Sequence, residues 1–83
     1  MLIIKVLGPG CENCKKLVSL TERAVNGLSV DAKVEKVTDY AEIMKYPILS
    51  TPGLVINEKL VVSGRVPGEA EITTFLTTAL MEE

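Results

Sequence analysis

The hydrophobic period of the chain changes at the Gly8-Pro9-Gly10 turn, and this change constrains the fold more than any other feature. Leu2–Leu7 is an apolar, β-branched run with a single charge, which predicts a strand buried on both faces. From Cys11 onward, apolar residues recur at three- and four-residue steps, which is typical of an amphipathic helix. Asn26-Gly27 is expected to end that helix as a left-handed cap. The chain therefore begins with a strand that runs directly into a helix.

The middle of the chain predicts a second strand and a short helix. Val30–Val37 alternates between apolar and polar residues, the pattern of a half-buried or edge strand. Asp39, with Glu42 three residues later, resembles a capping box and predicts a helix start. Pro47 must end that helix, because proline cannot donate the backbone hydrogen bond that a helix interior needs.

The C-terminal third predicts a hairpin and a last helix. Leu54–Ile56 and Leu60–Val62 are short apolar runs, and Asn57–Lys59 between them predicts the loop of a hairpin. Gly68 is the expected N-cap of the helix that follows. One stripe of that helix is apolar and comprises Ile72, Phe75, Leu76, Ala79 and Leu80.

The order βαβαββα predicts an α/β fold with one mixed four-stranded sheet flanked by helices. Two strands joined by a helix are expected to be parallel, whereas the hairpin strands are antiparallel. A chain of 83 residues with 47% hydrophobic residues has length for one core, so residues 1–83 are expected to form a single domain.

Charge and residue types exclude several classes of function. The net charge of −2 argues against a nucleic-acid partner, because phosphate binding relies on a basic face. The chain has no histidine, which excludes histidine bases and histidine-ligated metals. Within one chain, two cysteines and no histidine also cannot supply the four ligands of a structural zinc site, which only a dimer could build as Cys₄.

No segment predicts a membrane span or a signal peptide. The longest uncharged stretch, from Tyr46 to Asn57, is broken by Pro47, Pro52 and Gly53. The apolar N-terminal run is too short for a signal peptide. We therefore expect the cytoplasm, a reducing compartment in which a cysteine pair more often serves chemistry than architecture.

Cys11 and Cys14 form a Cys-x-x-Cys motif at the predicted junction of strand and helix. The amides at a helix start favour thiolate over thiol, so Cys11 is the expected nucleophile. Cys14 lies on the same side of the first turn, so the sulfurs can meet and Cys14 can act as the resolving thiol. Binding of a soft metal and a pair of inert cysteines are the alternatives that the motif leaves open.

Together with Thr51-Pro52-Gly53 before the third strand, these motifs resemble the thioredoxin fold in its glutaredoxin-sized form. More narrowly, Gly8–Lys16, Thr51–Ile56 and Gly64–Val66 are similar to the small redox-active disulfide proteins of prokaryotes. The resemblance covers nearly the whole chain. It implies that Pro52 is a cis-proline beside the disulfide, and that the backbone of Thr51 pairs with a segment of the substrate.

The resemblance also implies a function. We expect a small thiol–disulfide oxidoreductase that exchanges its Cys11–Cys14 pair with protein disulfides and needs no cofactor or metal. After Gly64 the chain lacks the second glycine and the acidic pair with which glutaredoxins hold glutathione. We therefore expect a protein electron donor similar to thioredoxin reductase, rather than glutathione.

The alternative from another class is a copper chaperone, because thiolates suit Cu(I) and those domains also place Cys-x-x-Cys between a strand and a helix. Copper chaperone domains have the order βαββαβ and end in a strand, whereas residues 68–81 here have a helical pattern. A non-catalytic adaptor is a third possibility, for which the sequence offers nothing specific.

Lys5 interrupts the strand predicted to be central. It lies six residues before Cys11, where thioredoxins hold a buried acid that assists proton transfer. One hypothesis is that its ammonium group lies below the cysteines and lowers their pKa by favouring thiolate. The alternative is that Lys5 buries its stem while its charge reaches solvent.

Overall fold

A computed structural model describes residues 1–48 and 50–82 and shows the predicted order of elements. The elements are β1 (Leu2–Leu7), α1 (Glu12–Leu28), β2 (Ala32–Val37), α2 (Tyr40–Ile43), β3 (Gly53–Ile56), β4 (Lys59–Ser63) and α3 (Glu69–Glu82).

The four strands form one mixed sheet in the order β2-β1-β3-β4. β1 pairs with β2 in parallel and with β3 in antiparallel orientation, and β3 pairs with β4 in antiparallel orientation. This confirms the predicted fold class. β1 therefore lies inside the sheet, so its C-terminal end, where the Cys-x-x-Cys segment begins, is held from both sides.

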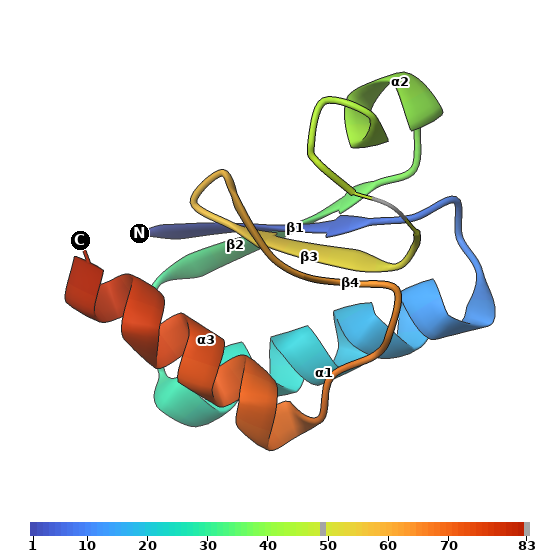
Figure 1. Cartoon of the computed structure of the whole chain (residues 1–83). Helices are drawn as coiled ribbons and strands as arrows, with labels where there is room; N and C mark the ends of the chain where they lie inside the picture. The colour runs from blue at the N-terminus through green and yellow to red at the C-terminus, as the bar shows by residue number, and fades with distance from the viewer. Residues whose placement is uncertain (49, 83) are drawn as a thin grey trace.

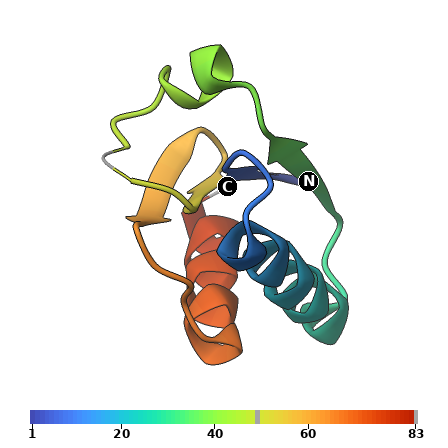
Figure 2. The same cartoon turned by 90° about the vertical axis from the view of Figure 1, so that its right-hand side faces the viewer.

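Helices cover the two faces of the sheet unequally. α1 and α3 lie on one face and the short α2 lies on the other (Figure 1), and the turned view shows α1 and α3 side by side beneath the sheet (Figure 2). The larger core lies between the sheet and the two long helices. Its fully buried side chains include Leu2, Ile4, Leu17, Leu54, Ile72 and Leu76. A smaller core of Leu7, Ile43 and Val55 lies under α2.

α1 ends two residues later than the sequence predicts. The expected cap at Asn26-Gly27 is wrong, because the helix continues to Leu28 and Ser29 adopts the left-handed conformation with φ of 53°. The Ser29 N–H donates to the carbonyl of Asn26 at 3.2 Å. Leu28 packs against the larger core, so apolar contact extends the helix past the glycine.

The short helix α2 begins as predicted but ends before Pro47. Asp39 is its N-cap, and its carboxylate accepts from the Ala41 N–H at 3.0 Å. Among the described residues, the second half of the predicted capping box is not formed; the Glu42 carboxylate pairs instead with Lys45 at 2.7 Å. With only four residues, α2 is held by Ile43 in the smaller core.

The hairpin turn is shorter than predicted, because Lys59 already belongs to β4. Asn57 and Glu58 form the turn with φ of 50° and 69°, the left-handed pair that fits the twist of a two-residue hairpin. The Asn57 N–H donates to the Ile3 carbonyl at 2.8 Å, and its side-chain oxygen accepts from the Ile3 N–H at 3.0 Å. The turn is thereby attached to β1.

Candidate active site

Cys11 lies at the N-terminus of α1, where the sequence predicts it. It is the N-cap, with extended backbone at φ of −69° and ψ of 168°, and its sulfur accepts from the Cys14 N–H at 3.2 Å. The side chain is exposed. A sulfur that accepts from a helix-start amide is in a position that favours the thiolate once the pair is reduced.

Cys14 lies one turn further and is buried. Only 4% of it is exposed, and it joins Cys11 in a disulfide across a Cα–Cα distance of 5.0 Å. The predicted pairing of the two sulfurs on one side of the first turn is therefore present. The two sulfurs differ in access: a partner in solvent reaches Cys11, whereas Cys14 is enclosed by protein.

Gly8 allows this arrangement, because the sulfur of Cys14 occupies the space that a side chain on Gly8 would need. A Cβ on Gly8 would also lie 3.2 Å from the Cys14 Cβ and 3.9 Å from the Thr51 Cβ. The Gly8 N–H donates to the Val37 carbonyl at 2.9 Å, which fixes the turn at the end of the sheet. The sequence identified Gly8 only as a turn residue, since nothing in a single sequence shows which side chain will pack on it.

Thr51 lies beside Gly8 and Cys14, and its peptide bond to Pro52 is cis, the isomer that the resemblance implies. The Pro52 carbonyl accepts from the Gly64 N–H at 2.9 Å, so the loop is anchored to the residue that follows β4. The structure therefore places Thr51 near the Cys11–Cys14 disulfide, and Pro52 follows Thr51 through the cis bond.

Lys5 does not belong to this group. On β1, Leu2, Ile4 and Val6 belong to the core under α1 and α3, whereas Leu7 belongs to the core under α2. Successive side chains of a strand point to opposite faces of the sheet, so Lys5, which lies between Ile4 and Val6, points toward the face covered by α2.

There the Lys5 ammonium group donates to Glu58 at 2.7 Å and to the Tyr46 hydroxyl at 3.0 Å, while 23% of the side chain stays exposed. These hydrogen bonds raise the pKa of Lys5, and the bond from Lys5 holds the pKa of Glu58 below its usual range. The arrangement favours the alternative in which the stem is buried and the charge is near solvent; the effect of Lys5 on the cysteines stays a prediction.

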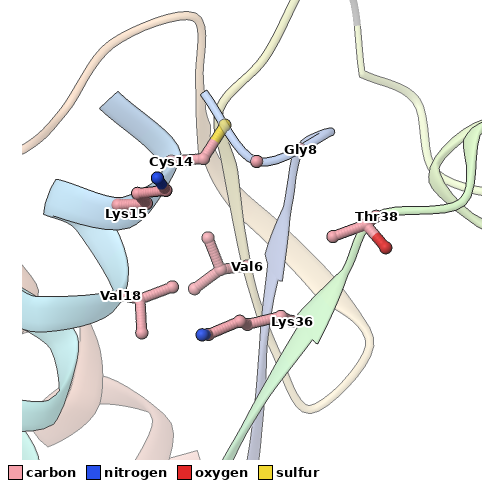
Figure 3. A pocket seen from close by; sticks show the side chains of 8 residues that line it. Val6, Gly8, Cys14, Lys15, Val18, Lys36 and Thr38 are labelled. Atoms are coloured by element: carbon pink, nitrogen blue, oxygen red, sulfur yellow. The ribbon is translucent and has the colours of Figure 1, made fainter. Parts of the chain in front are cut away.

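A small cavity of about 100 Å³ lies between α1 and the sheet and reaches Cys14 (Figure 3). Most of its wall is apolar, and its charged residues are Lys15 and Lys36. Both lysines are exposed. After Ala32 and Val34, the alternation of β2 predicts an apolar residue at position 36, where the chain has Lys36.

Comparison with known proteins agrees with this geometry. A family model described as a thioredoxin domain matches residues 2–77. The chain belongs to the thioredoxin family. It is 34% identical to a thioredoxin of Methanocaldococcus jannaschii over 80 residues, which cover 96% of this chain and 92% of that protein. It is also 34% identical to a thioredoxin of Methanothermobacter thermautotrophicus over 77 residues, which cover 93% of this chain and all of that protein.

The fold of the thioredoxin Deadhead from Drosophila melanogaster is similar, with a TM-score of 0.67 at 20% identity. The superposition covers 93% of this chain and 79% of Deadhead. This likeness shows the fold. The family model, the two thioredoxin relatives and the Cys11–Cys14 disulfide identify a small thioredoxin-like thiol–disulfide oxidoreductase.

Nothing favours the copper chaperone. The elements of the described residues follow the order βαβαββα, which differs from the βαββαβ order of the chaperone domains, and the family model is that of thioredoxins. Within residues 1–48 and 50–82, no helix is both long and apolar enough to cross a membrane.

The contact between Gly8 and Cys14 predicts opposite effects for two glycine substitutions. Gly8→Ala is expected to destabilise the fold by about 1–3 kcal/mol, because the new methyl group overpacks the Cys14 sulfur. Gly27→Ala is the control: its new methyl group would meet no atom within 4 Å, and alanine stabilises a helix by roughly 0.5–1 kcal/mol relative to glycine. Urea unfolding of the oxidised proteins measures both. Equal stability of Gly8→Ala and wild type would contradict the close contact.

The Lys5–Glu58 pair predicts a pH-dependent contribution to stability. Because the folded pKa of Glu58 is lowered, its contribution is present above the unfolded pKa of about 4.3 and is lost as the pH falls through the folded value. Wild type should therefore exceed Glu58→Gln in urea midpoint near neutral pH, with the difference shrinking below about pH 4. Glu22→Gln, at an exposed position with no ion pair among the described residues, should show no such trend. A difference independent of pH would contradict the ion pair.

Proposed function

We infer that the protein reduces disulfides of other proteins with Cys11 as the nucleophile and Cys14 as the resolving thiol. The observation that carries this assignment is the asymmetry of the two sulfurs. Cys11 is exposed at the start of α1, whereas Cys14 is 4% exposed and packed on Gly8. An accessible thiolate beside a protected thiol is what dithiol–disulfide exchange requires.

The reaction proceeds in two exchanges. The Cys11 thiolate attacks one sulfur of the target disulfide, forms a mixed disulfide with it, and releases the other target sulfur as a thiolate. Cys14 then loses its proton and attacks the Cys11 sulfur, which forms the Cys11–Cys14 bond and releases the second target sulfur. Two electrons pass to the target, and the protein is left in the oxidised form that the structure shows.

Thr51 and Pro52 are the substrate-binding residues of this proposal. Thr51 lies next to Gly8 and the disulfide, and Pro52 is held by the Gly64 N–H. Among the described residues, no backbone hydrogen bond involves Thr51. Its backbone is thus available to an extended segment of the target that adds to the loop as a strand would.

The proposed electron donor is a protein reductase similar to thioredoxin reductase, and the proposed compartment is the reducing cytoplasm. The segment after Gly64 supports a donor other than glutathione. Arg65 is the one arginine of that segment, and both ends of its guanidinium group are bound by the Glu71 carboxylate at 2.9 and 2.8 Å. Because the Arg65 guanidinium is already paired with a carboxylate, it is less available to bind glutathione, which is an anionic peptide.

Alkylation of the reduced protein tests the order of the cysteines. At neutral pH we expect Cys11 to react about tenfold faster than Cys14 or more, because it is exposed and its thiolate is favoured. Cys14→Ser should accumulate mixed disulfides with targets, whereas Cys11→Ser should not. Peptide mass mapping after partial alkylation gives the two rates, and equal rates would refute the assignment.

The mixed disulfide of Cys14→Ser with a cysteine peptide tests the role of Thr51. In this adduct the Thr51 amide should exchange with deuterium more slowly than in the free variant, because a target segment bonds to it. The Glu58 amide, in the hairpin turn at the opposite end of β3, serves as the control and should not change. Unchanged exchange at Thr51 would remove it from the substrate site.

A further inference from the structure

The Lys5 ammonium group is bound by two residues that lie far from it in the sequence. It donates to the Glu58 carboxylate of the hairpin turn at 2.7 Å and to the Tyr46 hydroxyl at 3.0 Å. The same hydroxyl lies 3.2 and 3.4 Å from the two carboxylate oxygens of Glu58. The three side chains therefore form a closed polar group on the α2 face of the sheet, and the proposed exchange reaction does not use it.

Tyr46 lies in the connection between α2 and β3, residues 44–52, which also carries Thr51 and Pro52 (Figure 1). Among the described residues of this connection, one backbone hydrogen bond reaches beyond α2 and the connection itself: the Gly64 N–H donates to the Pro52 carbonyl at 2.9 Å. Among its described side chains, that of Tyr46 alone hydrogen-bonds to a strand. The connection is thus anchored near its start by Tyr46 and at its end by Pro52.

Close packing links the two anchors. The side chain of Ile48 occupies the space that a Cβ on Gly53 would need, and the Ser50 hydroxyl occupies the corresponding space at Gly64. Ile48 also packs against the smaller core, as does the ring of Tyr46. Contacts of this kind transmit a displacement, because a close-packed interior leaves little free volume to absorb it. A shift at the first anchor is therefore expected to reach the loop before β3.

The hydroxyl of Tyr46 is held by charged partners on both sides. The hydrogen bonds raise the pKa of Lys5 and lower that of Glu58, so both groups are charged at neutral pH. A phenol oxygen can accept from the ammonium group while its proton points to the carboxylate. Hydrogen bonds to ionised groups are stronger than those between neutral groups. The ring is therefore fixed in one orientation.

We propose that Tyr46 is a positioning residue for the exchange reaction: bound between Lys5 and Glu58, its hydroxyl sets the loop on which Thr51 presents its backbone to a target. A target segment binds only the loop conformation that fits it, so its apparent affinity scales with the fraction of molecules in that conformation. Tyr46 acts through the loop and takes no part in proton or sulfur transfer. The proposal rests on the proposed substrate role of Thr51.

Tyr46→Phe provides the test, because it removes the hydroxyl and keeps the ring in the core. The reduced protein is mixed with an excess of either of two disulfides: a short peptide dimerised through its single cysteine, or hydroxyethyl disulfide, which has no backbone to bond to Thr51. The second-order rate constant for the peptide should fall about threefold to tenfold, the effect of one hydrogen bond. The rate constant for hydroxyethyl disulfide should stay at the wild-type value.

Tyr40→Phe is the matched control, since Tyr40 is 64% exposed on α2 and its hydroxyl has no hydrogen bond among the described residues. It should leave both rate constants unchanged. An unchanged peptide rate in Tyr46→Phe would overturn the proposal. An equal loss with both disulfides would also overturn it, because the effect would then lie in the thiols or in the fold, and so would a matching loss in Tyr40→Phe.

Lys5→Met tests the partner of the hydroxyl. The ratio of the peptide rate to the hydroxyethyl disulfide rate is compared, because any change in thiol reactivity cancels in it. In a Lys5→Met background, Tyr46→Phe should lower this ratio less than in wild type, since one of the two partners of the hydroxyl is already absent. An equal loss in both backgrounds would overturn the role of Lys5.

Deuterium exchange separates this proposal from the one on which it rests. The mixed disulfide of Cys14→Ser with a cysteine peptide is prepared with and without Tyr46→Phe, and protection of the Thr51 amide should be smaller with the substitution. Equal protection in the two adducts would overturn the positioning role of Tyr46 alone. Absence of protection in both would overturn the substrate role of Thr51, and the positioning role with it.

Discussion

The sulfur of Cys14 lies against the backbone of Gly8, and the geometry of the site depends on that contact. It places the first turn of α1 directly on the end of β1, with no side chain between them. Thr51 approaches the same point from the loop before β3. The sheet holds the position from two sides, because β1 is bonded to β2 and to β3. A larger residue at position 8 would separate the disulfide from both the sheet and the proposed substrate loop.

The same contact makes the two cysteines unequal. Cys14 packs inward on Gly8, so Cys11 is the cysteine that lies at the helix start and faces solvent. The Cys11 sulfur accepts a hydrogen bond from the Cys14 N–H. Chemical identity alone would give two equivalent thiols. The exposed Cys11 thiol is suited to attack the disulfide of a partner. The enclosed Cys14 thiol is not accessible to other disulfides, so it is suited to the intramolecular second step.

The distribution of charge across the sheet follows from strand alternation. Lys5 and Lys36 come from neighbouring strands and differ by one step in register, since Lys36 pairs with Val6. That single step places them on opposite faces. Glu58 in the hairpin turn binds the Lys5 ammonium group on the α2 face. Lys36 lies on the opposite face, where it lines the cavity between α1 and the sheet.

By itself, the sequence determined the order of elements, the mixed sheet and the junction that carries Cys11 and Cys14, because hydrophobic period and turn residues are local signals. It also indicated Thr51 and Pro52 through a family resemblance. Only the tertiary structure decided that α1 continues to Leu28 and that Lys5 lies on the α2 face of the sheet, where it binds Glu58. Helix ends respond to core contacts, and the neighbours of a side chain depend on strand register. Both are set by residues distant in the chain, so no local pattern contains them.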